Sequence, residues 1–296
     1  MAVSGLDVME GGSKLLIDTR TKESMIASLA SYLDITEDEL FQYIDYAANK
    51  AKPDRWAFNT DIFEEQFLSL FSDLQPEEQI DEIYVYHLTR RLNGSIEDKS
   101  SDNLKSLLLK ESAISTFLRQ YGIAFIEKDS HPVIVFNDRE ISLEDTFESD
   151  VCYLKSRLGY NSGREDYCFN GFALRDQLMR NSYTRQLYGG PEFLDVLSRY
   201  LSIDGLKEKY CENSKYYCFT YKMAIDDIMF DNRDDLGNDE KVDYFLVQVA
   251  MRIMSYMENS KFQYDHDNPI IRVADDASVP ENKIIDAEEI TLDMIK

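Results

Sequence analysis

The stretch IYVYHLTRRLNG (residues 83–94) marks the place where the periodicity of the chain changes. Before it, apolar residues recur every three or four positions, which is the pattern of amphipathic helices. Within it, β-prone residues follow one another in the manner of a strand, and similar runs occur later in the chain. The stretch therefore predicts an α+β protein in which a small helical region precedes a sheet.

Three helices are expected in the N-terminal region. Residues 21–33 (TKESMIASLASYL) place their apolar side chains on one stripe. Thr36 followed by Glu39 forms the capping box of a second helix. Asn59 or Thr60 provides the N-cap of a third helix. These signals predict a compact helical head.

A boundary is expected near Pro76, where DLQPEEQ interrupts the apolar periodicity. We therefore divide the chain into a helical region (1–76) and a larger domain (77–296). In the larger domain, residues 123–143 (IAFIEKDSHPVIVFNDREISL) carry strand and turn signals, and helices are expected at 174–181 and 239–259. Helices and strands do not alternate strictly, so a mixed or antiparallel sheet with helices is favoured over a doubly wound parallel sheet.

The charge of this 296-residue chain is large and unevenly distributed, with a formal net value of -24. Residues 1–82 hold 18 Asp and Glu against 6 Lys and Arg, and residues 223–296 hold 18 against 7. The centre, residues 83–222, holds 20 against 19. Acidic ends repel phosphate backbones, which argues against direct nucleic-acid binding, and they attract a basic protein surface. The alternative is that they only keep the protein in solution.

Several other classes of protein are excluded by what the sequence lacks. No apolar run approaches the length of a membrane span, and the N-terminus does not resemble a secretory signal, so we expect a cytoplasmic protein with no membrane partner. The four cysteines form no C-x-x-C pair, and nucleotide-binding and metalloprotease motifs do not occur. In the acidic run 226–243, counted from Asp231, Arg233 stands at position three and no glycine stands at position six, so an EF-hand is not supported and no metal site is expected.

The histidine of the opening stretch permits an enzymatic interpretation. His87 and Thr89 on one strand, the β-prone run YCFNGFAL and the late stretch NPIIRVADDASVPENKI together resemble the layout of ADP-ribosyltransferases. The resemblance implies NAD as the cofactor or substrate, with His87 and Thr89 at its ribose and Tyr167 or Phe169 on its nicotinamide. Asp267 stands near the position where that family has a glutamate, and its shorter side chain departs from the pattern. The alternative is that His87 is an ordinary hydrogen-bonded residue of a strand.

The favoured interpretation is a binding protein. Its size, its acidity and its Tyr- and Asp-rich runs, from ITEDELFQYIDYAANK (35–50) to DDIMFDNRDDLGNDEKVD (226–243), resemble phage anti-defence proteins such as the inhibitors of the Gabija system. The resemblance implies a homo-oligomer in the host cytoplasm that cages a nuclease complex and blocks access of DNA, without a cofactor. The interaction surface is expected at the following residues: Asp226, Asp227, Asp231, Asp234, Asp235, Asp239 and Glu240.

One further segment, YGGPEF (188–193), contains a paired-glycine turn. Such a turn is typical of a hinge or of the beginning of a helix, and the sequence does not choose between the two.

Overall fold

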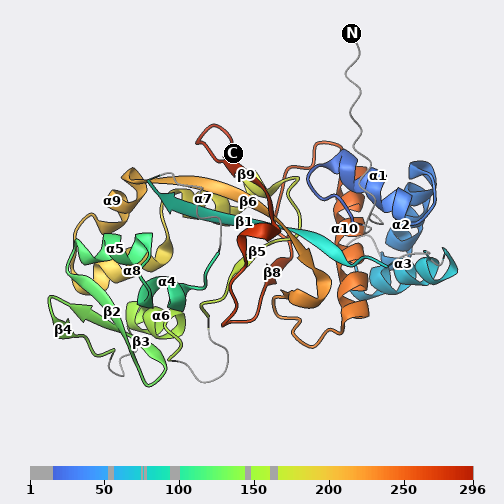
Figure 1. Ribbon diagram of the computed structural model, residues 1–296. Helices are drawn as coiled ribbons and strands as arrows, with labels where there is room; N and C mark the ends of the chain where they lie inside the picture. The colour runs from blue at the N-terminus through green and yellow to red at the C-terminus, as the bar shows by residue number, and fades with distance from the viewer. Residues whose placement is uncertain are drawn as a thin grey trace, which may run out of the picture.

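The protein is described by a computed structural model that covers most of the chain. The described residues are 16–52, 57–74, 76, 79–93, 101–143, 148–160 and 166–295. The predicted α+β class is confirmed: N-terminal helices precede a mixed region that contains a six-stranded antiparallel sheet and further helices. Figure 1 shows these parts in order along the colour bar.

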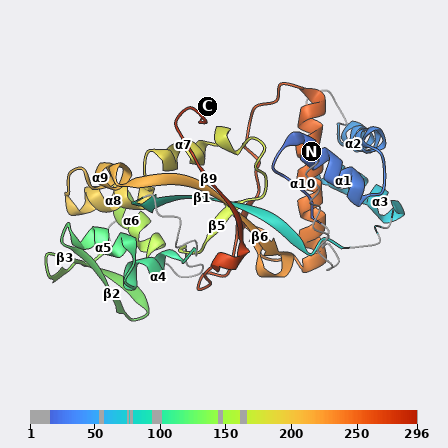
Figure 2. The same ribbon diagram turned by 45° about the horizontal axis from the view of Figure 1, so that its top comes forward.

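Three N-terminal helices, α1 (Lys22–Tyr32), α2 (Glu37–Ala51) and α3 (Thr60–Leu74), pack against the long helix α10 (Asn238–Glu258). The predicted capping box of α2 is present, since the backbone N–H of Glu39 donates to Thr36 Oγ1 over 3.2 Å and the Glu39 carboxylate accepts from the Thr36 N–H. Figures 1 and 2 both place α10 beside this group. The C-terminal part of the chain thus completes the N-terminal helical head.

The central sheet has the strand order β7-β8-β5-β1-β6-β9, with every neighbouring pair antiparallel. Its strands are β1 (Glu82–Leu92), β5 (Asn170–Phe172), β6 (Ser214–Ala224), β7 (Met229–Phe230), β8 (Ile270–Arg272) and β9 (Ile284–Glu289). Most of the stretch IYVYHLTRRLNG (residues 83–94) forms β1, and β1 pairs with β6 over its whole length. In Figure 1 these two strands run from the helical head to the far side of the molecule.

A second lobe lies at that far end and has its own apolar core. Its elements are α4 (Leu104–Leu109), α5 (Ala113–Arg119), β2 (Ile123–Lys128), β3 (His131–Phe136), β4 (Arg139–Glu140), α6 (Ser149–Arg157), α8 (Glu192–Leu201) and α9 (Leu206–Glu212). The strands predicted within 123–143 are confirmed as a three-stranded antiparallel sheet. The core includes the buried residues Leu118, Ile134, Leu154 and Leu197.

The predicted helix at 174–181 is wrong. This segment forms only a 3₁₀ turn at Leu178–Arg180, followed by α7 (Ser182–Tyr188), which the sequence analysis did not anticipate. The physical reason lies in Leu174, whose N–H and carbonyl both bond to the side chain of Asn268. Its carbonyl is thereby already engaged by a distant residue rather than by the next helical turn.

The main apolar core extends across the proposed boundary at residue 76. Phe63 and Phe67 of α3 belong to the same cluster of buried residues as Phe219 and Tyr221 of β6. The division of the chain into two domains at residue 76 stays a prediction about folding units.

A buried ionic network fixes α10 to the rest of the protein. Arg252 of α10 forms ion pairs with Asp176 and Asp265, and the side chains of these three residues are 5%, 1% and 0% exposed. The Tyr256 hydroxyl donates to the Asp176 carboxylate. Burial raises the pKa of Asp176, and the neighbouring Arg252 opposes that shift. Among the described residues, Arg252 is therefore the cation that compensates the buried charges of both Asp176 and Asp265.

Replacing Arg252 with alanine is expected to lower the free energy of unfolding by about 3 to 5 kcal/mol, because it leaves Asp176 and Asp265 buried without their cation. Chemical denaturation of the variant and the unmodified protein at neutral pH measures this difference.

The matched control is Arg199→Ala. Arg199 also pairs with two carboxylates, those of Asp150 and Asp195, but on the protein surface, where water replaces the lost contacts. The control should unfold near the midpoint of the unmodified protein. Equal destabilisation of the two variants would contradict the prediction, because it would show that burial does not increase the cost of removing the arginine.

Candidate functional site

His87 lies on the face of the sheet that also carries Phe169 and Tyr221. The centroid of its ring is 4.5 Å from that of Phe169 and 6.2 Å from that of Tyr221. Its Nδ1 lies 2.6 Å from the backbone carbonyl oxygen of Asn170. Because a carbonyl only accepts hydrogen bonds, Nδ1 must carry the proton, and Nε2 of the neutral ring is left as an acceptor.

The environment of His87 favours its neutral form. Desolvation among the aromatic rings lowers the pKa of His87 to about 4; the hydrogen bond to Asn170 opposes this shift, and the nearby Arg91 guanidinium adds to it. At neutral pH this histidine is therefore an uncharged ring packed in a strand.

The residues suggested by the enzymatic interpretation are only partly brought together. Thr89 follows two positions after His87 on β1, and Phe169 packs on His87. Tyr167 is buried, with its ring next to Gly159 at the end of α6. Asp267 is exposed in the loop before β8.

The pairing of β5 with β8 shows how far Asp267 lies from His87. Asn170 lies opposite Arg272, whereas the Ala173 N–H donates to the carbonyl of Pro269. Three residues of strand separate Asn170 from Ala173, which is about 10 Å. Asp267 lies further still along the chain, so the structure does not place a carboxylate from this loop at His87.

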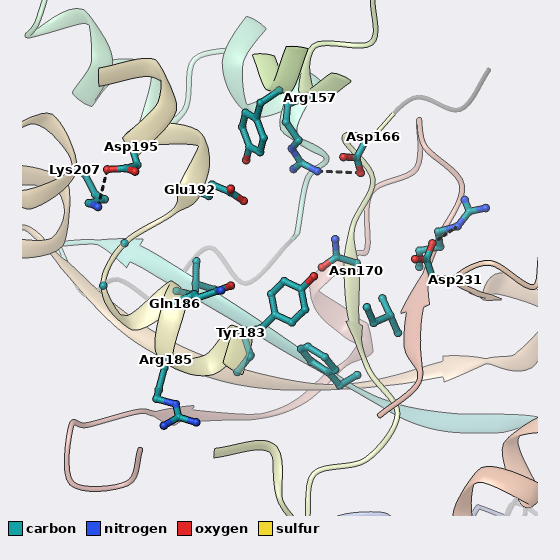
Figure 3. A pocket seen from close by; sticks show the side chains of 18 residues that line it. Arg157, Asp166, Asn170, Tyr183, Arg185, Gln186, Glu192, Asp195, Lys207 and Asp231 are labelled. Atoms are coloured by element: carbon teal, nitrogen blue, oxygen red, sulfur yellow. Dashed lines mark ion pairs between the residues drawn. The ribbon is translucent and has the colours of Figure 1, made fainter. Parts of the chain in front are cut away.

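A cavity of about 800 Å³ lies on the opposite face of the sheet. Its floor is apolar and consists of Leu88, Phe172 and Ile270. Its walls come from α6, α7, the following glycine pair, α8 and α9 (Figure 3). Neither His87 nor Thr89 contributes to it, because side chains of a strand alternate between the two faces. The cavity and the histidine are thus separate features.

The cations of the cavity wall are mostly neutralised within the wall. The pairs are Arg157–Asp166 at 3.0 Å, Lys207–Asp195 at 2.7 Å and Arg272–Asp231 at 3.6 Å. Glu192, at the start of α8, forms no ion pair within the described part of the chain, and Figure 3 shows its carboxylate pointing into the hollow. Arg185 points away from the other wall residues in the same view.

Of these wall residues, Asp231 alone was among the site residues predicted from the sequence. The wall residues come from segments between Leu88 and Arg272, and only the pairing of distant strands and helices brings them together. The one local signal was the paired glycine of residues 188–193, which closes α7 and leads into α8.

The acidic residues expected to form an interaction surface divide into two groups. Arg272 pairs with Asp231 and Asp234, and Lys283 lies 3.8 Å from Asp227. The Glu240 carboxylate accepts the backbone N–H of Gly237 at the start of α10. The remaining members are exposed and make no ion pair with any described residue: Asp226, Asp235 and Asp239.

A larger group of uncompensated carboxylates lies on α3, on α10 and in the segment just before α10. We call it the acidic helical face, and it consists of Asp61, Glu64, Glu65, Asp235, Asp239, Glu240 and Asp243. None of these forms an ion pair with a described cation. Desolvation raises the pKa of Asp243, and the charges of Asp239, Glu64 and Glu240 raise it further. The acidic ends of the chain therefore meet at one end of the molecule.

Comparisons with protein-family models, with curated proteins and with solved structures found no match. The two resemblances described from the sequence accordingly stay predictions. Within the described ranges, no helix is both long enough and apolar enough to cross a bilayer. The same ranges hold no cluster of three or more His, Cys, Asp or Glu side chains suited to a metal ion.

Lowering the pH should destabilise the protein through His87. Its folded pKa of about 4 lies below the ordinary value of 6.5, so the unfolded chain binds a proton that the folded protein does not. The free energy of unfolding should fall by at most about 2 kcal/mol between pH 7 and pH 5 on this account. Denaturation of the unmodified protein and of His87→Gln, each at pH 7 and pH 5, isolates the contribution of His87. The carboxylates titrate equally in the two proteins, so their contribution cancels in the comparison. An identical pH dependence in the two proteins would contradict it.

Proposed function

We propose that the protein binds a partner with a basic surface through the acidic helical face, and that the bound partner can no longer use that surface to hold nucleic acid. The observation that carries the proposal is the convergence of α3 and α10, which brings acidic side chains from both ends of the chain together. The partner that fits best is a nuclease of a defence complex, met in the cytoplasm of a phage-infected host.

Electrostatics supports this choice of partner. α3 carries acidic and no basic residues, and the two cations of α10, Lys241 and Arg252, are buried. The solvent-facing charge of these two helices is therefore negative throughout. Surfaces that hold DNA are rich in Lys and Arg, and opposed potentials accelerate the encounter of such partners. The nearly balanced central segment, 83–222, contributes little to this field.

Caging a large complex requires more than one acidic face. We include in the proposal a homo-oligomer in which each copy presents its acidic helical face, so that several weak contacts act together. The binding needs no cofactor and no direct contact with nucleic acid.

Neutralising the acidic helical face should weaken partner binding by at least about tenfold at low salt, because several screened charge pairs are lost together. The test variant carries Glu64→Gln, Asp235→Asn, Asp239→Asn and Asp243→Asn. Affinity capture from host lysate at low and high salt identifies the partner. Titration of the purified partner, with its DNA cleavage as a second readout, then gives the affinity.

A control with the same change in charge carries Glu111→Gln, Asp138→Asn, Asp204→Asn and Glu208→Gln, all exposed positions outside the acidic helical face. It should retain both binding and inhibition. Loss of binding in both variants would mean that total charge, rather than this face, is responsible. Unchanged binding of the test variant at every ionic strength would end the proposal.

One observation favours a second candidate, an NAD-dependent ADP-ribosyltransferase: the contact between His87 and the ring of Phe169. The two candidates make opposite predictions for His87→Ala. Inhibition of a partner should survive this substitution if the protein folds, whereas NAD turnover should disappear. An assay of nicotinamide release by the unmodified protein and by the variant separates the two.

A further inference from the structure

The cavity between the sheet and the second lobe combines an apolar floor with an open polar wall. Leu88, Phe172 and Ile270 form the floor. Figure 3 shows the polar side chains of the wall around it: Tyr183, Asn170, Gln186 and Glu192. A volume of about 800 Å³ is ample for a small organic molecule.

The unpaired charge that points into this cavity is negative. Three cations of the lining, Arg157, Lys207 and Arg272, each lie beside a carboxylate of the wall. The fourth cation, Arg185, points away from the other wall residues in Figure 3. Arg272 makes further ion pairs with Asp234 and Asp275, which lie outside the wall. The carboxylate of Glu192 is the charge directed into the hollow that has no counterion among the described residues.

The beginning of α8 does not turn the cavity into an anion site. A free helix N-terminus attracts phosphate through its unpaired N–H groups and its dipole. Here the first turn carries Glu192 and Asp195, and both line the cavity. Their negative charges oppose the positive end of the helix dipole and repel a second anion.

Tyr153 adds a hydrogen-bond donor beside Glu192. Burial raises the pKa of Tyr153 to about 12; the Arg157 guanidinium opposes the shift, and the Glu192 charge contributes to it. The phenol therefore keeps its proton at neutral pH. Its ring, together with that of Tyr183, offers aromatic surface on which a cation is favoured.

From these features we propose that the cavity binds a small organic cation with an amine or guanidinium head and an apolar stem. The head pairs with Glu192 near the Tyr153 ring, and the stem lies on Leu88 and Phe172. Asn170 and Gln186 supply amide oxygens for the remaining N–H donors. The net negative charge of the chain concentrates such ligands around the protein. This site is independent of the acidic helical face.

The test uses isothermal titration calorimetry on the full chain with three probes: butylguanidine, methylguanidine and adenosine monophosphate. Butylguanidine should bind saturably at one site per chain. Methylguanidine has the same head but only a methyl group for a stem, so it should bind at least about tenfold more weakly because the floor contributes apolar contact. Adenosine monophosphate should not bind.

The variant Glu192→Gln should weaken butylguanidine binding by at least about tenfold, since a charge-assisted contact becomes a neutral one. Glu111→Gln, an equal change in charge at an exposed position between α4 and α5, is the control and should bind as the unmodified protein does. Thermal unfolding checks that both variants fold.

Three outcomes would overturn the proposal. One is the absence of saturable butylguanidine binding, and another is equal affinity in Glu192→Gln and the unmodified protein. The third is binding of adenosine monophosphate in preference to butylguanidine, which would make the paired arginines the recognition groups. Should Glu192→Gln fail to fold, Tyr183→Ala replaces it, and unchanged butylguanidine affinity in that variant overturns the proposal equally.

Discussion

The pairing of β1 with β6 is the constraint on which the rest of the structure depends. The two strands are aligned from Glu82 opposite Ala224 to Leu92 opposite Ser214. Their register decides which side chains face which side, because successive residues of a strand alternate. It places His87 among aromatic rings and Leu88 on the floor of the cavity. A slip of one residue would exchange them and put a polar ring into an apolar floor, so the buried faces specify the register.

The same pairing determines how charge is distributed over the molecule. The beginning of β1 and the end of β6 lie at the helical head, so the segments before β1 and after β6 both continue there. The acidic ends of the chain are thereby brought together, while the balanced centre forms most of the second lobe. Because β1 and β6 join the two lobes, the uneven distribution of charge along the sequence becomes an uneven distribution over the molecule, with the acidic segments at the helical head.

The sequence predicted those features that depend on neighbouring residues. The capping box at Thr36 and Glu39 and the strands of 123–143 are formed by contacts within a few positions, and the structure confirms them. The helix expected at 174–181 fails because Asn268, almost a hundred residues away, bonds to the backbone of Leu174. The cavity could not be predicted for the same reason: its wall exists only after distant elements pair.

Charges in the cavity and on the helices obey different physical limits. Within the wall, partial loss of water makes an isolated charge costly, and Arg157, Lys207 and Arg272 each lie beside a carboxylate, whereas the unpaired Glu192 is exposed to water. On α3 and α10, water solvates the carboxylates and no internal cation is needed. The run 226–243 lies partly in each setting, because Arg272 pairs with Asp231 and Asp234 but no described cation lies within ion-pair distance of Asp239. An acidic run in a sequence therefore overstates the charge that a partner meets, and the binding surface must be assigned from the carboxylates that remain unpaired after folding.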